Sequence, residues 1–175
     1  MRMIAVMTGL IFLVSMTYLA LAQEGKEAAK EEVKHEYVGV KVCKLCHTKD
    51  GIYPSWEKTK HATAYDSLTE AQKKEKGIDA YYTTGKLPDG TLLTNIQCEA
   101  CHGPGSDYKM ISIMKDKEKA MANGLNLPTA ETCQKCHNEN APTEALKATV
   151  KGFDFEKMKA KVHVMPYPME EKTEE

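Results

Sequence analysis

The residues of this 175-residue chain best suited to chemistry are its six cysteines and six histidines. All the cysteines lie in three copies of one pattern, Cys-x-x-Cys-His, at residues 43–47, 98–102 and 133–137. On a helical turn the two cysteines of such a motif share a face, because residues i and i+3 are neighbours there. Their thiols can add to the two vinyl groups of a porphyrin, and the following histidine then reaches the iron. This is the attachment pattern of c-type haem.

Three other uses of the same residues fit the sequence less well. Disulfides within each motif would close small strained loops and leave the adjacent histidines unexplained. Structural zinc takes four ligands from paired motifs, and three equal motifs divide awkwardly into such sets. A thioredoxin-like site has one motif beside a βαβ pattern, which this sequence lacks. The sequence therefore predicts three covalently attached c-type haems, bound through Cys43, Cys46, Cys98, Cys101, Cys133 and Cys136.

The histidine count equals the number of axial positions on three haem irons. Three histidines end the motifs and act as the first iron ligands: His47, His102 and His137. Three others are free to act as the second ligands: His61, His163 and His35. The pattern thus predicts bis-histidine ligation of every iron, although one of the ten methionines could replace a histidine. Spacing does not say which free histidine meets which haem.

A helix is expected to position His61. The segment from Pro54 to about Lys76 has helical spacing of its apolar residues, and this spacing puts His61 on the apolar face. Pro54 suits the first turn of such a helix and Gly77 suits its end. A capping pair within the segment, Thr69 with Gln72, would break it into two helices.

The rest of the chain is expected to alternate loops with short helices. Residues 78–96 read as a loop with a short hairpin around residues 89–90. Further helices are expected over residues 106–123, after Thr129, and after the capping residue Asp154, which precedes the segment that carries His163. No stretch shows sustained alternation of apolar and polar residues. The predicted fold class is therefore mainly α and loop-rich.

The composition indicates that haem fills the core. After residue 22, roughly 14% of the residues are Leu, Ile, Val or Phe, which is below the roughly 20% expected of a chain that buries its own core. The 24 basic and 25 acidic residues nearly cancel, so disorder is a poor explanation. Three large apolar macrocycles would supply the missing buried area. Nucleic acid is excluded as a partner because the only arginine, Arg2, lies in the apolar N-terminal segment.

The chain divides into four expected parts. Residues 1–22 read as a signal peptide with an Ala-Leu-Ala cleavage site, which predicts export to the periplasm or beyond the cell. A charged flexible tether follows over 23–36, then a three-haem cytochrome domain over 37–166, and a disordered tail over 167–175. The alternative for residues 1–22 is an uncleaved anchor, since its apolar stretch is long enough to cross a bilayer. After cleavage, no stable membrane insertion is expected.

Four segments of the chain together resemble the multihaem cytochrome c-554 family. They are Tyr37-Val38-Gly39, Trp56 followed by Lys60-His61-Ala62, the run from Cys98 to Ser106, and Phe153-Asp154-Phe155-Glu156 leading to His163. The resemblance covers residues 37–166. It implies a mainly α-helical periplasmic electron-transfer protein with closely stacked haems, and it implies distal iron ligands at His61 and His163.

One departure from that family stands out. Its members usually carry a further Cys-x-x-Cys-His before a Thr-Gly pair, where this chain has residues 78–85 without cysteine or histidine. The resemblance thus implies a four-haem design with one haem removed, and any activity that the family owes to that haem is in doubt. Tyr81 and Tyr82 either fill the vacated space or are ordinary loop aromatics.

The leading hypothesis is a three-haem electron carrier that is not an enzyme. Bis-histidine ligation closes both axial positions of an iron, which leaves only a change of oxidation state. Its partners would be redox proteins, docked electrostatically through the many lysines. Two alternatives stay open. A haem enzyme or nitrogen oxide binder would keep one iron five-coordinate, for instance by leaving His35 unused, and an oligomeric haem assembly would conduct along many copies of the chain.

Overall fold

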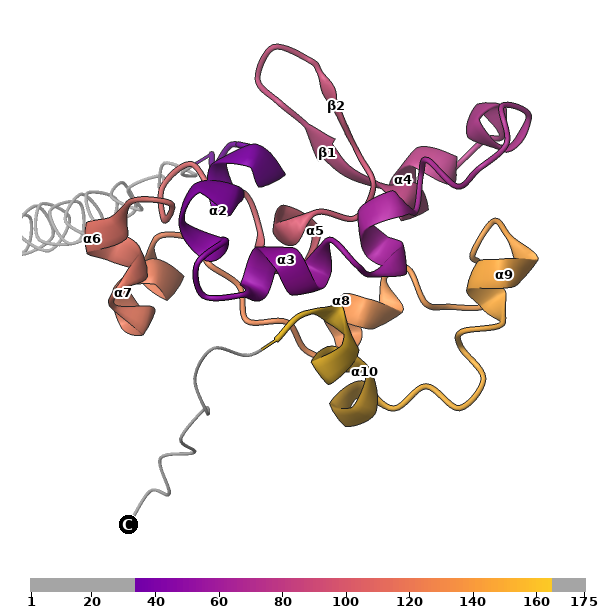
Figure 1. The fold of residues 1–175 in the computed structure, drawn as a ribbon. Coiled ribbons are helices and arrows are strands. Elements are labelled where there is room, and N and C mark those ends of the chain that lie inside the picture. Colours follow the sequence, from indigo (N-terminus) through magenta and orange to yellow (C-terminus); the bar gives the residue numbers. More distant parts are fainter. Residues whose placement is uncertain (1–33, 165–175) are drawn as a thin grey trace, which may run out of the picture. The chain divides into compact units, whose positions relative to one another are not determined.

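A computed structural model describes residues 34–164, and these are mainly helical and loop-rich, as predicted (Figure 1). The elements are α2 (Val40–His47), α3 (Ile52–Trp56), η1 (Lys60–Thr63), η2 (Gln72–Lys74), α4 (Ile78–Tyr82), β1 (Thr83–Lys86), β2 (Leu92–Thr94), α5 (Cys98–His102), α6 (Ile111–Met114), α7 (Lys117–Ala122), α8 (Ala130–Gln134), α9 (Glu144–Lys147) and α10 (Phe155–Val162). The predicted signal peptide, residues 23–33 of the predicted tether and the predicted tail lie outside the described residues.

Two helix starts are where the capping residues predict them. The Thr129 side chain and the Thr132 side chain cap each other's backbone ahead of α8. The Asp154 carboxylate accepts a hydrogen bond from the Lys157 backbone N–H at 3.1 Å ahead of α10. A side-chain acceptor satisfies an amide that has no partner within the helix, which is why local sequence fixes these starts.

The helical stretch predicted over residues 54–76 is wrong in its extent. Helix α3 starts earlier, after Gly51 in the left-handed conformation (φ 81°), and ends at Trp56. The backbone is extended at Thr59, so only two short 3-10 turns, η1 and η2, follow. The predicted break at Thr69 is confirmed, because the Gln72 backbone N–H donates to the Thr69 hydroxyl at 3.3 Å.

Residues 78–96 contain a helix that the sequence analysis misses and a hairpin that it predicts. Helix α4 occupies the first five of these residues. Strands β1 and β2 then pair antiparallel, and the turn between them includes Gly90 at φ 86°. The predicted helix over 106–123 starts later, as α6, and is broken before α7, where the Asp116 carboxylate caps a new helix by accepting from the Lys119 N–H at 2.9 Å.

Side chains alone form only a small core in the described part of the chain. Leu68, Ile78 and Tyr82 make one buried cluster, against which Tyr65, Tyr81, Ala64 and Leu146 pack. Elsewhere a large apolar residue such as Leu45, on α2, is 79% exposed. Among residues 34–164 there is no helix with the length and apolar character needed to cross a membrane.

Candidate haem attachment sites

Each Cys-x-x-Cys-His motif begins on a short helix. The first lies on the last turn of α2, the second makes up α5, and the third starts on α8 and ends just after it. None of the six cysteines is in a disulfide. The helical turn therefore offers both thiols of each motif to one ligand.

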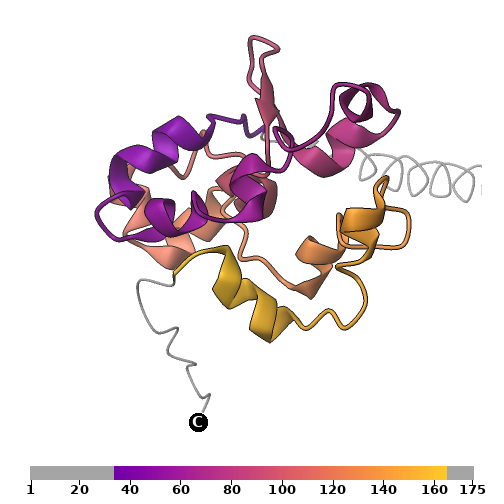
Figure 2. The same ribbon diagram turned by 45° about the vertical axis from the view of Figure 1, so that its right-hand side comes forward.

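The second motif lies next to both of the others. The Cys98 thiol interacts with the Cys43 thiol of the first motif, and this contact lowers the pKa of Cys43 and raises that of Cys98. Burial raises the pKa of Cys101 to about 11, and the third-motif thiols of Cys133 and Cys136 add to the shift. Figures 1 and 2 show α5 inside the structure, with α2 and α8 on either side of it in Figure 1. The three motifs are thus arranged in series, with the second in the middle.

Two motif histidines each face a histidine from outside the motifs. The ring centres of His61 and His137 are 6.0 Å apart, with the ring planes almost perpendicular. The ring centres of His102 and His163 are 6.1 Å apart. The partners in these pairs are far apart in sequence, so only the fold brings them together.

This spacing fits two axial ligands of a single iron. An imidazole nitrogen–metal bond is about 2 Å long and the nitrogen lies about 1 Å from its ring centre, so two such ligands on opposite sides have ring centres roughly 6 Å apart. Both observed pairs meet that requirement. In contrast, no group of three or more His, Cys, Asp or Glu within residues 34–164 is arranged to hold a metal ion by itself.

The remaining two histidines bond with carboxylates. His35 Nδ1 lies 2.6 Å from Asp107 Oδ2, and His47 Nδ1 lies 2.7 Å from Asp50 Oδ2. His35 falls within the predicted tether, yet its ring also packs against Gly124, where a Cβ would approach His35 Nε2 to 2.9 Å. His35 is therefore held by two contacts distant in sequence.

The same nitrogen, Nδ1, is engaged in five of the histidines. Besides His35 and His47, the Nδ1 partners are the Asn126 carbonyl for His102 (2.9 Å), the Thr149 hydroxyl for His137 (2.5 Å) and the Val164 carbonyl for His163 (2.9 Å). Histidines that bind a metal through Nε2 typically hold Nδ1 in such a bond, which fixes the ring orientation. A bond at Nδ1 leaves Nε2 as the ring nitrogen that could bind a metal.

Burial favours the neutral form of His61, His102 and His137, and only a neutral imidazole nitrogen binds a metal. It lowers the pKa of His61, and the neighbouring His137 lowers that pKa further. It also lowers the pKa of His137 and of His102, although the hydrogen bond with Asn126 partly opposes the shift at His102.

Three hydrogen bonds position two of the histidines that lie outside the motifs. The Ile96 backbone N–H donates to the His61 carbonyl at 3.0 Å, and the Trp56 indole N–H donates to the Ile96 carbonyl at 3.1 Å. The Val164 N–H donates to the Ser55 hydroxyl at 2.9 Å, which fixes the end of α10 against α3. His61 and His163 are therefore placed by contacts with the segments around the first two motifs.

Sequence reasoning misses the residues that bond with Nδ1. Asp50 follows His47 by three residues, and this spacing could have indicated a contact between the two side chains on one helical turn. Asp107, Asn126 and Thr149 are distant from their histidines or lie in loops. Only the fold reveals these three.

Tyr81 and Tyr82 are not loop aromatics. Both lie on α4, and Tyr82 belongs to the buried cluster. The Tyr82 hydroxyl lies 2.5 Å from the Thr143 hydroxyl, and the Tyr81 hydroxyl donates to Asn138 at 3.4 Å. The two tyrosines thus tie α4 to the segment that follows the third motif.

Comparison with known families decides between the possible uses of these motifs. A family model described as outer membrane cytochrome MtrC/MtrF-like, domains II/IV, matches residues 24–167. The chain belongs to this multihaem c-type cytochrome family. The predicted resemblance to multihaem cytochromes is thereby confirmed, and family membership indicates covalently bound haem c.

This cytochrome is also similar to cytochrome c-554 of Nitrosomonas europaea. The two sequences are 29% identical over 154 residues, which cover 67% of this chain and 65% of that protein. The cytochrome thus spans just under two thirds of its relative's length. The solved structure of cytochrome c554 from the same organism, in its reduced state, superposes with a TM-score of 0.54 at 21% identity, covering 75% of this chain and 85% of the other. The shared fold is that of a multihaem c-type cytochrome.

Proposed function

We propose that this cytochrome is a periplasmic carrier with three covalently attached haems, each with two histidine ligands. In this proposal residues 1–22 are a signal peptide, residues 23–36 a tether, and residues 37–166 the haem domain. The carrier exchanges electrons with redox protein partners and has no catalytic residues.

The pairing of motif and free histidines is the observation that carries the proposal. We assign His61 with His137 to one iron and His163 with His102 to another, because each pair has the ring separation of two axial ligands. His35 and His47 remain for the third iron. When bound, each haem supplies a one-electron iron couple. The second motif adjoins both of the others, so its haem would connect the other two for electron transfer.

The side chains of this chain hold and isolate those couples. Nδ1 bonds at five histidines fix the rings, so Nε2 is kept in place through a change of iron charge. Two imidazoles on an iron also exclude other ligands. Because no substrate can then bind the iron, the protein needs no side chain that donates a proton there.

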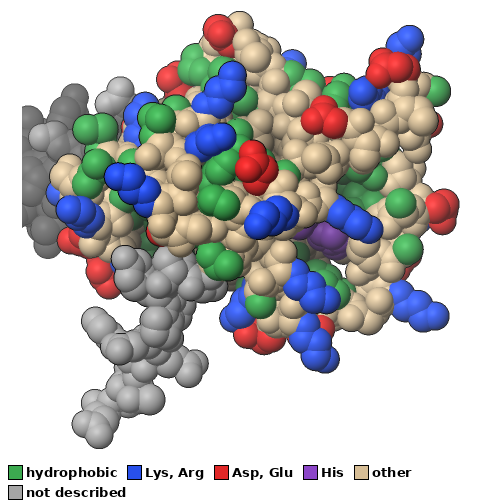
Figure 3. Space-filling model, viewed as in Figure 1, with side chains coloured by type: hydrophobic (Ala, Val, Ile, Leu, Met, Phe, Trp, Pro, Cys, Tyr) green, Lys and Arg blue, Asp and Glu red, His purple; other side chains and the backbone are tan. Residues whose placement is uncertain are grey.

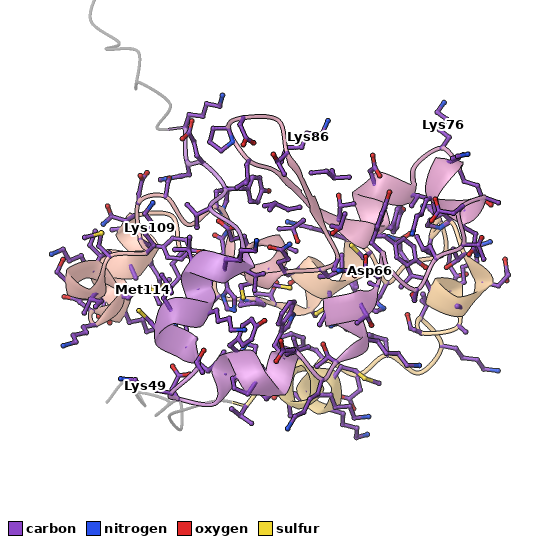
Figure 4. All side chains as sticks on the ribbon, turned by 45° about the horizontal axis from the view of Figure 1, so that its top comes forward. Lys49, Asp66, Lys76, Lys86, Lys109 and Met114 are labelled. Carbon is purple, nitrogen blue, oxygen red and sulfur yellow. The ribbon has the colours of Figure 1, made fainter. Side chains whose placement is uncertain are left out.

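Lysines offer a docking surface for an acidic redox partner. Figure 3 shows lysine side chains spread over the face viewed there, with a histidine visible among them. Lys76 and Lys86 are exposed and point away from the body of the structure (Figure 4). Electrostatic contacts of this kind speed association and keep the complex weak, which suits repeated electron exchange.

A second candidate function follows from His35 and His47. Within residues 34–164 no ring contact joins these two histidines, in contrast to the two close pairs. If His35 does not bind the iron held by His47, that iron is open and can bind a small ligand such as a nitrogen oxide. An oligomeric haem assembly is the third candidate, and particle size by light scattering separates it from a monomer.

Haem counting tests the proposed cofactor content. The purified, denatured protein is expected to retain haem on extraction with acidified organic solvent, at three haems per chain by iron and haem assay. A variant with Cys133→Ser and Cys136→Ser is expected to retain two, since thioether bonds are the only covalent links. A count of two or four for the parent protein would contradict the proposal.

A further inference from the structure

Glu99 is the only charged side chain buried in the described part of the chain, with 2% of its surface exposed. It lies between the two cysteines of the second motif, on α5. Burial of a carboxylate is costly unless hydrogen bonds replace the lost water. A buried charge inside a haem attachment motif therefore calls for a physical explanation.

Backbone amides from two segments surround the Glu99 carboxylate. The Val38 N–H donates to both oxygens, at 2.9 and 3.2 Å, and the Gly39 N–H donates to Oε2 at 2.7 Å. The Gly105 N–H donates to Oε1 at 2.6 Å. Val38 and Gly39 immediately precede α2, and Gly105 follows α5. Glu99 thus joins the start of the first-motif helix to the end of the second.

The packing around these amides leaves no room for a larger residue at Gly105. A Cβ there would lie 3.1 Å from Glu99 Oε1 and 3.0 Å from the Val38 side chain. Gly39 has a φ of 78°, which a side chain rarely tolerates. The two glycines allow the amides to approach the carboxylate closely. The amides thus form an anion-binding site, and the Glu99 carboxylate occupies it.

Within the described residues, the charge of Glu99 has no partner of opposite sign. Among residues 34–164, none of the ion pairs involves Glu99. Backbone N–H dipoles stabilise the ionised carboxylate without cancelling its charge. Gly39, which donates to this carboxylate, also accepts from the Cys43 thiol at 3.9 Å, and Cys98 precedes Glu99 directly, so the carboxylate lies beside attachment cysteines of both motifs. A carboxylate is therefore held by backbone amides where the two motifs meet.

We infer that Glu99 is a positioning residue that fixes the first motif next to the second. Its charge also lowers the reduction potentials of the haems attached to these two motifs. The inference rests on the proposed attachment of haem at Cys43 and Cys98. A fixed negative charge in a region of low dielectric disfavours the addition of an electron nearby. Charge and hydrogen bonding around a haem are among the means by which proteins set its potential.

Glu99→Gln in the intact three-haem protein tests the charge. The substitution keeps the size of the side chain and removes its charge, so one or two of the three midpoint potentials are expected to rise while the third stays at its parent value. Glu131→Gln is the matched control: Glu131 is an exposed carboxylate two residues before Cys133, and its loss is expected to leave all three potentials unchanged. Unchanged potentials in Glu99→Gln would overturn the inference.

Glu99→Asp separates charge from positioning. The shorter side chain keeps its charge but cannot reach both segments, so the melting temperature is expected to fall while the potentials stay closer to parent values than in Glu99→Gln. A rise in potential equal to that of Glu99→Gln would overturn the electrostatic part. If Glu99→Gln does not accumulate with three haems, a parent-like melting temperature in Glu99→Asp would overturn the positioning part. A parent protein without covalent haem would instead refute the proposed function.

Discussion

The chain produced in the cytoplasm, without haem attachment, is expected to be largely unfolded. Only eight apolar side chains are buried among residues 34–164, and just three of them, Leu68, Ile78 and Tyr82, form a cluster. Burying one such side chain stabilises a fold by about 1.5–3 kcal/mol, whereas ordering each residue costs about 1–2 kcal/mol of backbone entropy. A cluster of this size cannot order more than a hundred residues.

Circular dichroism during heating measures this effect. The haem-free chain, produced without its signal peptide, is expected to show low helicity and no cooperative transition. The exported holoprotein is expected to show high helicity and a cooperative transition. Hydrogen exchange is expected to leave weak residual protection only near α4, where the cluster lies. A cooperative melt of the haem-free chain would mean that side chains alone make the core.

His61→Ala is expected to open one iron in three. His61 lies 6.0 Å from His137 between ring centres and is held by the Ile96 hydrogen bond to its carbonyl. The substitution removes a ligand without touching a cysteine, so all three haems stay attached. One haem is expected to become high-spin, and on reduction that haem alone is expected to bind carbon monoxide.

Lys60→Ala is the control for His61→Ala, because Lys60 is the exposed neighbour on the same 3-10 turn. It is expected to keep the parent spectrum and to refuse carbon monoxide. A low-spin His61→Ala protein that also refuses carbon monoxide would show that the second ligand of the His137 iron lies elsewhere, with a methionine the next candidate.

Local patterns predict the parts of this molecule that depend on neighbouring residues. The three motifs, the caps at Thr129 and Asp154, and the hairpin turn at Gly90 each rest on contacts within a few residues. The helix predicted over residues 54–76 fails because the backbone is extended at Thr59, although Ala64, Tyr65 and Leu68 of its apolar face do pack together. Apolar periodicity alone does not show where the backbone breaks a helix.

Contacts between residues far apart in the sequence were not predicted, for a different reason. The facing of His61 and His137 joins segments 76 residues apart, and nothing in either segment encodes the other. Glu99 occupies a position within the motif that tolerates many residue types, so its burial is visible only once Val38 and Gly105 are placed around it. The Nδ1 partner of His35, Asp107, is likewise set by tertiary contacts.

The spectrum of the isolated protein tests the central proposal most directly, since it reports the ligation of every iron at once. Absorption and electron paramagnetic resonance spectra of the oxidised protein, followed by absorption after dithionite reduction with and without carbon monoxide, are the measurements. Three bis-histidine haems predict low-spin bands only and no change with carbon monoxide. A high-spin fraction that binds carbon monoxide would contradict that prediction, and its location at the His47 iron, shown by an unaltered spectrum in His35→Ala, would favour the ligand-binding function.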